Sequence, residues 1–379
     1  MADEIQVLIV DDSALMRNLI GHMIEDTPGL AVAEKAMNGI FALQKIPRVN
    51  PDVIVLDLEM PEMNGIEFLK ERKKQGITVP VVILSSIAAR GAEITMEALS
   101  LGASDFIQKP SGSISEDIHV VKETLVNKLL GYGGAYRKTQ GRKVLSPVEY
   151  KEKTPSDKHS DVAIHFKLAA SPVIEPAQPP VRARSPAKTE IIAIGISTGG
   201  PDALRVVFSK LDADLKIPIV VVQHMPAGFT NEFAKSLDRI CPLDVKEAED
   251  GDPIQPGRIL IAQGNKHLEV EKKAAGAVVR LSDDPLVSGH RPSADVLFAS
   301  VAMNYSNHAL GVIMTGMGRD GAQHLGTIYK EGGMTLGQDE ASAVVYGMPR
   351  VAYELGHVME QVSLPNMARR ICEVAKAQR

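Results

Sequence analysis

Several features that mark other classes of protein are scarce in this sequence. Among its 379 residues there is no tryptophan, and only two are cysteine, Cys241 and Cys372. Two cysteines that lie in no metal-binding or disulfide pattern indicate a reducing compartment. No apolar run approaches the ~20 residues needed to cross a bilayer, and the first residues lack the basic segment of a signal peptide. We therefore expect a cytoplasmic protein with no direct membrane insertion.

The sequence also lacks an excess of positive charge. Its net charge is −5, whereas proteins that bind nucleic acid concentrate basic residues to meet phosphates. Basic residues gather instead in residues 131–189, which are rich in proline, serine and lysine and show no apolar periodicity. Such a composition is typical of a flexible linker. We predict no nucleic-acid partner and three parts: a domain over residues 1–130, a basic linker over 131–189 and a second domain over 190–379.

Short apolar runs alternate with amphipathic segments on both sides of this linker. Because the runs are continuous rather than alternating, they favour parallel sheets that helices cover on both faces. The expected strands are Val7–Val10, Val53–Leu56, Val81–Leu84 and Phe106–Ile107 in the first domain, and Ile191–Ile194, Ile219–Val222, Ile259–Ala262, Val278–Leu281 and Leu310–Met314 in the second. The predicted fold class is α/β, with two doubly wound, three-layer parallel-sheet domains.

Polar residues follow the strands of the first domain where each strand ends. Asp11 and Asp12 follow the first strand, Asp57 the third, Ser85 the fourth and Lys109 the fifth. The carboxyl ends of parallel strands meet at one edge, and carboxylates that converge there repel one another unless a hard cation such as Mg²⁺ joins them. Helix capping is an alternative role for a single aspartate, but it does not account for the whole set.

This set resembles the receiver domain of two-component response regulators, over about residues 3 to 125. The resemblance implies phosphorylation of Asp57 by a histidine kinase. It also implies an Mg²⁺ site formed by Asp11, Asp12, Asp57 and the backbone carbonyl of Glu59, and switch roles for Ser85, Phe106 and Lys109. A receiver is a switch, so the output is expected in the second domain.

The glycine-rich turn that opens the second domain, Gly195-Ile-Ser-Thr-Gly199, allows several interpretations. A dinucleotide fingerprint needs glycine where Ser197 stands and an acid after the next strand, which ends instead in Gln223-His224. A P-loop needs a Gly-Lys-Ser/Thr ending that is also missing. The turn does fit G-x-S-x-G, in which small neighbours expose a nucleophilic serine. Taken alone, however, the five residues favour an ordinary tight turn.

Two further residues at strand ends favour the nucleophile. His224 follows the strand Ile219–Val222, and Asp320 follows Leu310–Met314, so both emerge at the same edge as Ser197. Serine needs a base to take its proton, and the imidazole needs a carboxylate to fix its tautomer. Alternatively, His224 is an ordinary strand-end histidine and Asp320 caps a helix that begins near Ala322. The pattern alone leaves both possibilities open.

Six motifs make residues 190 to about 372 similar to the catalytic domain of chemotaxis protein-glutamate methylesterases. They are Gly195–Pro201, Val222–Pro226, Ile261–His267, His290–Asp295, Thr315–Gly321 and Gly347–Pro349. The resemblance implies a serine carboxylic-ester hydrolase with Ser197 as nucleophile, His224 as base and Asp320 as its orienting partner. The implied substrates are glutamate γ-methyl esters on the cytoplasmic helices of methyl-accepting chemoreceptors, with methanol released. A second implied activity is deamidation of specific receptor glutamines.

Two points on the chemistry follow. The backbone amides of Thr198 and Met317, in the glycine-rich turns, are candidates for an oxyanion hole. No metal is expected for the ester chemistry, since Mg²⁺ belongs to the receiver.

The competing hypothesis is a response regulator whose second domain only binds a protein partner. A DNA-binding output would require a helix-turn-helix and a basic surface, and the sequence offers neither.

Overall fold

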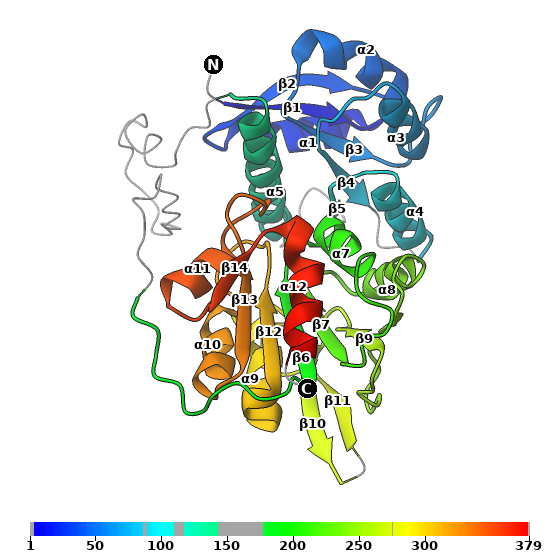
Figure 1. The fold of residues 1–379 in the computed structure, drawn as a ribbon. Coiled ribbons are helices and arrows are strands. Elements are labelled where there is room, and N and C mark those ends of the chain that lie inside the picture. The colour runs from blue at the N-terminus through cyan, green and yellow to red at the C-terminus, as the bar shows by residue number, and fades with distance from the viewer. Residues whose placement is uncertain (1–3, 86–88, 110–116, 143–176, 275, 378–379) are drawn as a thin grey trace. The chain divides into compact units, whose positions relative to one another are not determined.

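The computed structural model describes residues 4–85, 89–109, 117–142, 177–274 and 276–377. It contains two α/β units, one on a five-stranded sheet and one on a seven-stranded sheet (Figure 1). Each unit is described by itself. Within these described ranges, no helix is long and apolar enough to cross a membrane.

The N-terminal sheet is wholly parallel and has the order β2-β1-β3-β4-β5. Its strands are β1 (Ile5–Val10), β2 (Leu30–Ala36), β3 (Val53–Asp57), β4 (Val81–Ser85) and β5 (Asp105–Gln108). The apolar runs expected as strands are confirmed. The strand count, with Asp57 after the third strand, implies a second strand, but the sequence does not locate it, because only Leu30–Ala33 of β2 form an apolar run and only its end residues Leu30 and Ala36 are buried. The strand order reverses between β1 and β3, so their carboxyl ends flank the crevice at the switch point.

Among the described residues, the helices of this unit are α1 (Ala14–Glu25), α2 (Gly39–Val49), α3 (Gly65–Lys74) and α5 (Asp117–Thr139), and α4 (Ala89–Ser100) connects β4 to β5 in the chain. The first three begin at a polar side chain that accepts a hydrogen bond from the first turn. Ser13 accepts from the amide of Met16, and Asn38 accepts from the amide of Phe41. Asn64 completes a capping box with α3. These caps satisfy amides that have no partner within their own helix.

Helix α5 runs past residue 130, where the sequence pattern places the start of the linker. Arg137 donates to the carbonyl of Glu4 (2.7 Å) and to Asp52 Oδ2 (3.1 Å), and Arg142 Nη2 lies 2.7 Å from Asp52 Oδ1. The carboxylate of Asp52 is fully buried. Two basic residues that resemble linker composition in the sequence thus tie the helix end to the first sheet. Residues 143–176 of the predicted linker lie outside the described residues.

The C-terminal sheet is also wholly parallel, with the order β14-β13-β12-β6-β7-β9-β8. Its strands are β6 (Ile191–Ile196), β7 (Ile219–Gln223), β8 (Asp244–Glu247), β9 (Arg258–Ile261), β12 (Ala309–Ile313), β13 (Met334–Gln338) and β14 (Glu360–Val362). Its order reverses between β6 and β12, which neighbour each other. The predicted fold class, two doubly wound parallel-sheet domains, is confirmed.

One predicted strand of this sheet lies elsewhere. Residues 278–281, expected in the parallel sheet, belong to β11 (Gly276–Ser282), which pairs antiparallel with β10 (His267–Lys273) in a separate two-stranded sheet. Parallel strands need a crossover of a dozen or more residues, and only two residues join these strands. A hairpin is therefore the pairing that this connection permits.

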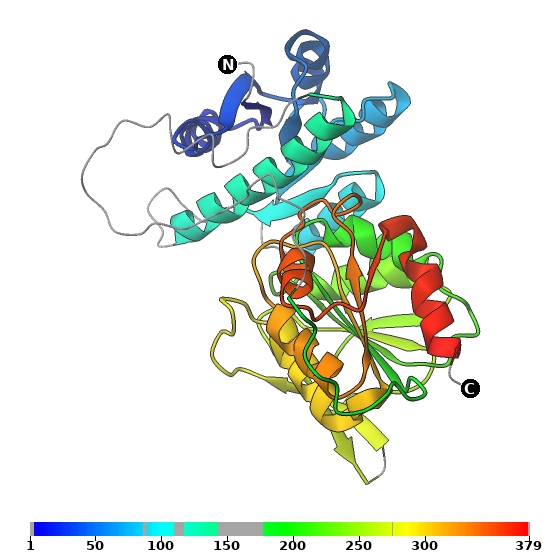
Figure 2. The same ribbon diagram turned by 60° about the vertical axis from the view of Figure 1, so that its left-hand side comes forward.

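Helices cover both faces of the seven-stranded sheet. They are α7 (Gly200–Phe208), α8 (Thr230–Asp238), α9 (Ala294–Tyr305), α10 (Ala322–Lys330), α11 (Met348–Glu354) and α12 (Leu364–Lys376), with a 3₁₀ turn η1 (Ser306–His308) after α9. Figure 2 shows the sheet between two helical layers, with α9 and α10 packed together on one face and α7 and α12 on the other. Coverage on both sides explains why every residue of β6 is buried.

Residues 177–190, which we call the strap, run along the ends of helices in the C-terminal unit. Arg182 Nη2 donates to the carbonyls of Gly332 and Gly333 (2.7 Å each), and its guanidinium lies 5.0 Å from the ring centre of Tyr329. The amide of Ala183 donates to Lys330 at the end of α10 (2.7 Å). The strap was assigned to the linker, because backbone contacts and one arginine leave no apolar period in the sequence.

We predict that Arg182→Ala lowers the free energy of unfolding of the C-terminal unit by about 1–3 kcal/mol, because two carbonyls lose their charged donor. Urea denaturation followed by circular dichroism measures this loss. Arg184→Ala is the matched control, since that side chain is exposed, and surface changes stay within about 0.5 kcal/mol. Equal effects of the two substitutions would show that the strap does not stabilise the unit through Arg182.

Candidate active site and acidic site

The three residues predicted as a triad lie at the carboxyl ends of adjacent strands. Strand β6 lies between β12 and β7, so Ser197, Asp320 and His224 emerge side by side. The Nδ1 atom of His224 is 3.0 Å from Ser197 Oγ, and its Nε2 atom is 2.7 Å from Asp320 Oδ2. One imidazole ring therefore bridges the serine hydroxyl and the carboxylate.

Both glycines of the G-x-S-x-G pattern have a structural reason to be glycine. A Cβ on Gly195 would lie 2.7 Å from the Cβ of Ala294, so a side chain there would push α9 off the sheet. Gly199 has φ +84°, in the left-handed region that side chains avoid. Between them the chain turns from β6 into α7 and leaves Ser197 partly exposed. The turn thus holds the serine at the edge of the sheet, as the pattern predicts.

The carboxylate of Asp320 is 1% exposed and is surrounded by donors. Besides its contact with His224, it accepts from the hydroxyl of Ser293 (2.6 Å) and from the amides of Ala294 (2.7 Å) and Asp295 (3.2 Å). These donors form the first turn of α9, where free amides and the helix dipole favour a negative charge. The residue at the cap position of α10 is Gly321. Asp320 therefore accepts hydrogen bonds from the first turn of α9, whose N-cap is Ser293, and does not cap the helix that begins at Ala322.

These contacts control the charge of the site. Burial by itself raises the pKa of Asp320, but its hydrogen bond to His224 and the donors of α9 hold that pKa below the usual value. A second ring, His290, stacks on His224 with centroids 3.9 Å apart and planes inclined by 17°. Burial and the neighbouring His224 lower the pKa of His290 to about 4. The sequence pattern predicts no role for His290 or Ser293, although the motif His290–Asp295 contains both.

The geometry sets the tautomer of His224. When Nε2 carries the hydrogen that Asp320 accepts, Nδ1 is left with a lone pair directed at the hydroxyl of Ser197. The serine can then donate its proton to Nδ1 as its oxygen attacks an electrophile. The imidazolium that results is stabilised by the buried carboxylate. The site is therefore suited to nucleophilic attack on a carbonyl carbon.

The two oxyanion candidates lie in the turns next to Ser197. Thr198 follows the serine and is buried. Met317 follows Gly316, where an added Cβ would lie 2.9 Å from the Cβ of Ser197. Within the described residues, neither amide donates a hydrogen bond inside the protein. Both amides thus remain available to a substrate oxygen, and their role stays a prediction.

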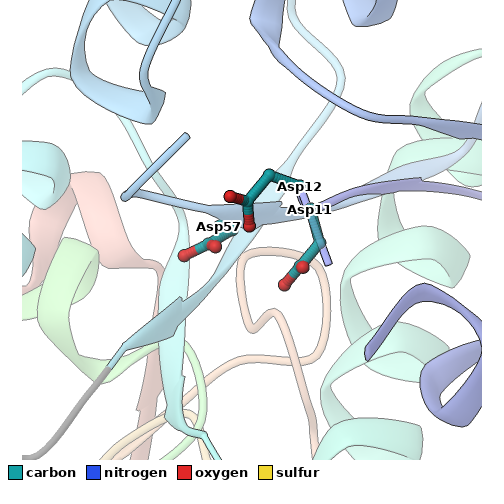
Figure 3. Close-up of side chains that lie close together, drawn as sticks. All are labelled: Asp11, Asp12 and Asp57. Atoms are coloured by element: carbon teal, nitrogen blue, oxygen red, sulfur yellow. The ribbon is translucent and has the colours of Figure 1, made fainter. Parts of the chain in front are cut away.

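The N-terminal unit holds a second cluster, which we call the acidic site. Asp11, Asp12 and Asp57 each place a carboxylate oxygen within 4.8 Å of the others (Figure 3). They come from the carboxyl ends of β1 and β3, which are paired neighbours at the switch point. Carboxylate oxygens are hard ligands, and a set of them this close is compatible with Mg²⁺.

Lys109 adds a positive charge to the acidic site. Its Nζ lies 2.7 Å from Asp57 Oδ2 and 3.3 Å from Asp11 Oδ2. Burial raises the pKa of Asp57, and the hydrogen bond from Lys109 only partly opposes that rise. Burial alone would lower the pKa of Lys109, but its contacts with Asp57 and Asp11 raise it overall. The ammonium is therefore held in its charged form against Asp57.

The remaining receiver residues lie near the same edge. Ser85 is the last residue of β4 and is buried, as is Phe106 in β5. Glu59 donates its amide to Asp57 Oδ1 (3.2 Å). Switch roles for Ser85 and Phe106 and a ligand role for the carbonyl of Glu59 stay predictions.

Comparisons with known proteins agree on both units. The family model described as CheB methylesterase matches residues 192–371, and that of the response regulator receiver domain matches residues 7–119. A protein-glutamate methylesterase/protein-glutamine glutaminase of Treponema denticola is 59% identical over 99% of each chain. A namesake from Treponema pallidum is 49% identical over 99% of this chain and 98% of its own. The solved CheB methylesterase catalytic domain of Thermotoga maritima is 35% identical, covering 49% of this chain and 98% of its own (TM-score 0.48).

We predict that Asp320→Asn lowers the free energy of unfolding by about 1–3 kcal/mol at neutral pH, because an amide in this buried place cannot accept from all the donors. The lowered pKa of Asp320 means that its stabilising contribution is present above the unfolded pKa and is lost as pH falls through the folded pKa. The difference between wild type and variant should therefore shrink in acid. Urea denaturation at neutral pH and below pH ~4 measures it, and a difference that does not change with pH would contradict this account.

Proposed function

Because the chain belongs to the family of protein-glutamate methylesterases/protein-glutamine glutaminases, we propose that it removes methyl esters from glutamate γ-carboxyls of chemoreceptors, under the control of its receiver domain. It also deamidates specific receptor glutamines. Relatives of this name match 99% of the chain, both units included. A second domain that only binds a partner is not favoured, since the relatives are named for hydrolysis.

The observation that carries the proposed mechanism is the bridge of His224 between Ser197 and Asp320. Nδ1 of His224 takes the hydroxyl proton as Ser197 Oγ attacks the ester carbonyl. The same nitrogen returns the proton to the methoxy group, which leaves as methanol. Water, activated by His224, then hydrolyses the glutamyl-serine ester and regenerates the enzyme. This makes the protein a serine carboxylic-ester hydrolase.

The same intermediate accounts for the second activity. Attack on a glutamine side chain forms the identical glutamyl-serine ester, with ammonia leaving in place of methanol. In both reactions negative charge develops on the carbonyl oxygen. We assign the stabilisation of that charge to the amides of Thr198 and Met317, which donate to no acceptor among the described residues.

The receiver supplies control. Asp57 accepts a phosphoryl group from a chemotaxis histidine kinase, and Lys109, already 2.7 Å from its carboxylate, holds the charged product. Asp11, Asp12 and Asp57, together with the backbone carbonyl of Glu59, would hold Mg²⁺. When bound, Mg²⁺ offsets the negative charge of the converging carboxylates and of the phosphoryl group.

Ser85 and Phe106 rearrange in response to phosphorylation and act as the switch. The protein works in the cytoplasm on the cytoplasmic helices of its receptors.

We expect Ser197→Ala to reduce methanol release from a methylated receptor fragment on the order of 10⁴–10⁶-fold, because the attacking oxygen is gone. The fold should survive, since the side chain is partly exposed. Ser209→Ala, an exposed serine at the end of α7, is the matched control and should keep full activity. Near-normal hydrolysis by folded Ser197→Ala would eliminate Ser197 as the nucleophile.

For the receiver, we expect acetyl phosphate to phosphorylate the chain only when Mg²⁺ is present, and Asp57→Asn to abolish the reaction. Phosphate incorporation in metal-free and Mg²⁺-containing buffer measures both effects. Asp26→Asn is the control, because that aspartate is exposed and pairs with Lys122. Undiminished phosphorylation in excess chelator would contradict the Mg²⁺ assignment. Ester hydrolysis by residues 177–379 alone should not respond to the chelator.

A further inference from the structure

The hydrogen bonds of His224 leave one motion of its ring unrestrained. Contacts at Nδ1 and Nε2 fix the two nitrogens against Ser197 and Asp320, but the ring can still tilt about the line that joins them. A tilt turns the Nδ1 lone pair away from the serine hydroxyl. The face-to-face stack of His290, at 3.9 Å, limits this tilt on one side.

His290 is itself held in place by a tight turn. The amide and carbonyl of Val287 exchange hydrogen bonds with the carbonyl and amide of His290 (3.1 and 2.9 Å). Between them, Ser288 and Gly289 both have positive φ, at 54° and 79°, as in the two-residue turn that joins tightly paired strands. The hydroxyl of Ser288 also donates to Asp295 in the first turn of α9 (3.1 Å). The turn is thus tied to the helix that carries the donors of Asp320.

The next residue, Arg291, fastens this loop to the neighbouring turn. Its Nη1 donates to the carbonyls of Asp283 (2.7 Å) and Asp284 (3.1 Å). Its Nε and Nη2 both donate to Asn265 Oδ1 (3.2 and 2.9 Å), and the amide of Asn265 donates back to the carbonyl of Arg291 (3.2 Å). We call these contacts the Arg291 clamp. It joins the motifs Ile261–His267 and His290–Asp295, to which the proposed mechanism assigns no role.

The charge of His290 suits a ring that lies against the base. Burial and the neighbouring His224 lower the pKa of His290 to about 4, with Asp320 opposing. His290 is therefore neutral near pH 7. A cation there would oppose the proton that His224 takes from Ser197, whereas a neutral ring does not.

We propose that His290 is a positioning residue, which stacks on His224 under the control of the Arg291 clamp and keeps the base aligned between Ser197 and Asp320. This rests on the proposed function of the same site. The proposal requires a flat, uncharged ring at position 290 and does not require a contact between His290 and the substrate.

The experiment uses the full chain and a peptide with one glutamate γ-methyl ester. We expect His290→Ala to lower kcat for methanol release on the order of 10–100-fold, since misplacement by about 1 Å has that effect, with KM unchanged. His290→Phe keeps a flat face and should restore kcat to within about threefold of wild type. Arg291→Met, which removes the clamp, should lower kcat about tenfold. Leu286→Ala, an exposed residue of the same loop, is the control and should leave kcat unchanged.

Two results would overturn the proposal. One is an unchanged kcat in His290→Ala; if KM rises at the same time, His290 contacts the substrate instead. The other is a His290→Phe variant that is as slow as His290→Ala although it is equally folded by circular dichroism. If His290→Ala does not fold, the Phe and Arg291→Met variants still decide the matter.

A second readout separates this proposal from the proposed function. A fluorophosphonate probe forms a P–O bond to an activated serine as fluoride leaves, and needs no receptor chemistry. If wild type reacts with the probe but releases no methanol, the methylesterase assignment fails, and slower labelling of His290→Ala still supports the positioning role. Equal labelling of both proteins overturns it.

Discussion

The C-terminal site depends on one buried charge, the carboxylate of Asp320. A carboxylate that is 1% exposed costs several kcal/mol to bury unless donors surround it. Here the donors come from the first turn of α9 and from His224. Helix α9 therefore has to approach the carboxyl ends of the strands closely, and the absence of a side chain at Gly195 permits that approach. The position of the base follows from the same requirement, since His224 donates to one of the carboxylate oxygens.

The sequence predicts this site well because of a general property of parallel sheets. Residues far apart in the chain converge when each follows a strand, so Ser197, His224 and Asp320 could be grouped from strand ends alone. The same rule grouped Asp11, Asp57 and Lys109. What surrounds the triad does not follow a strand. His290 reaches the ring of His224 from a loop, and no rule of periodicity or strand order predicts which loop residue packs on which face.

Strand β2, the strap and the end of α5 share one reason for being hard to recognise in the sequence. Strand β2 buries only its two ends, and the strap is held by backbone hydrogen bonds and Arg182, so neither is a fully buried apolar run like β3. The end of α5 has basic residues, which composition assigns to solvent, yet Arg137 meets the buried Asp52. In the strap and at the end of α5, hydrogen bonds to residues distant in sequence hold the chain in place. In most other elements, buried apolar side chains do so. Composition detects burial through apolar residues and does not detect a buried ion pair.

The two sites use the same place in the same fold, the switch point of a doubly wound sheet, but handle negative charge in opposite ways. At the acidic site three carboxylates converge, burial raises the pKa of Asp57, and Lys109 balances only part of the charge. The cluster is therefore compatible with a further cation. At Asp320 the first turn of α9 and one imidazole use both oxygens of a single carboxylate. Apart from the donors of α9, the carboxylate then hydrogen-bonds only with His224 among the described residues. A serine nucleophile requires a base that is oriented and stabilised by a carboxylate in this way. The acidic site thus leaves part of its negative charge unbalanced, whereas the single carboxylate of Asp320 has a donor for each of its oxygens.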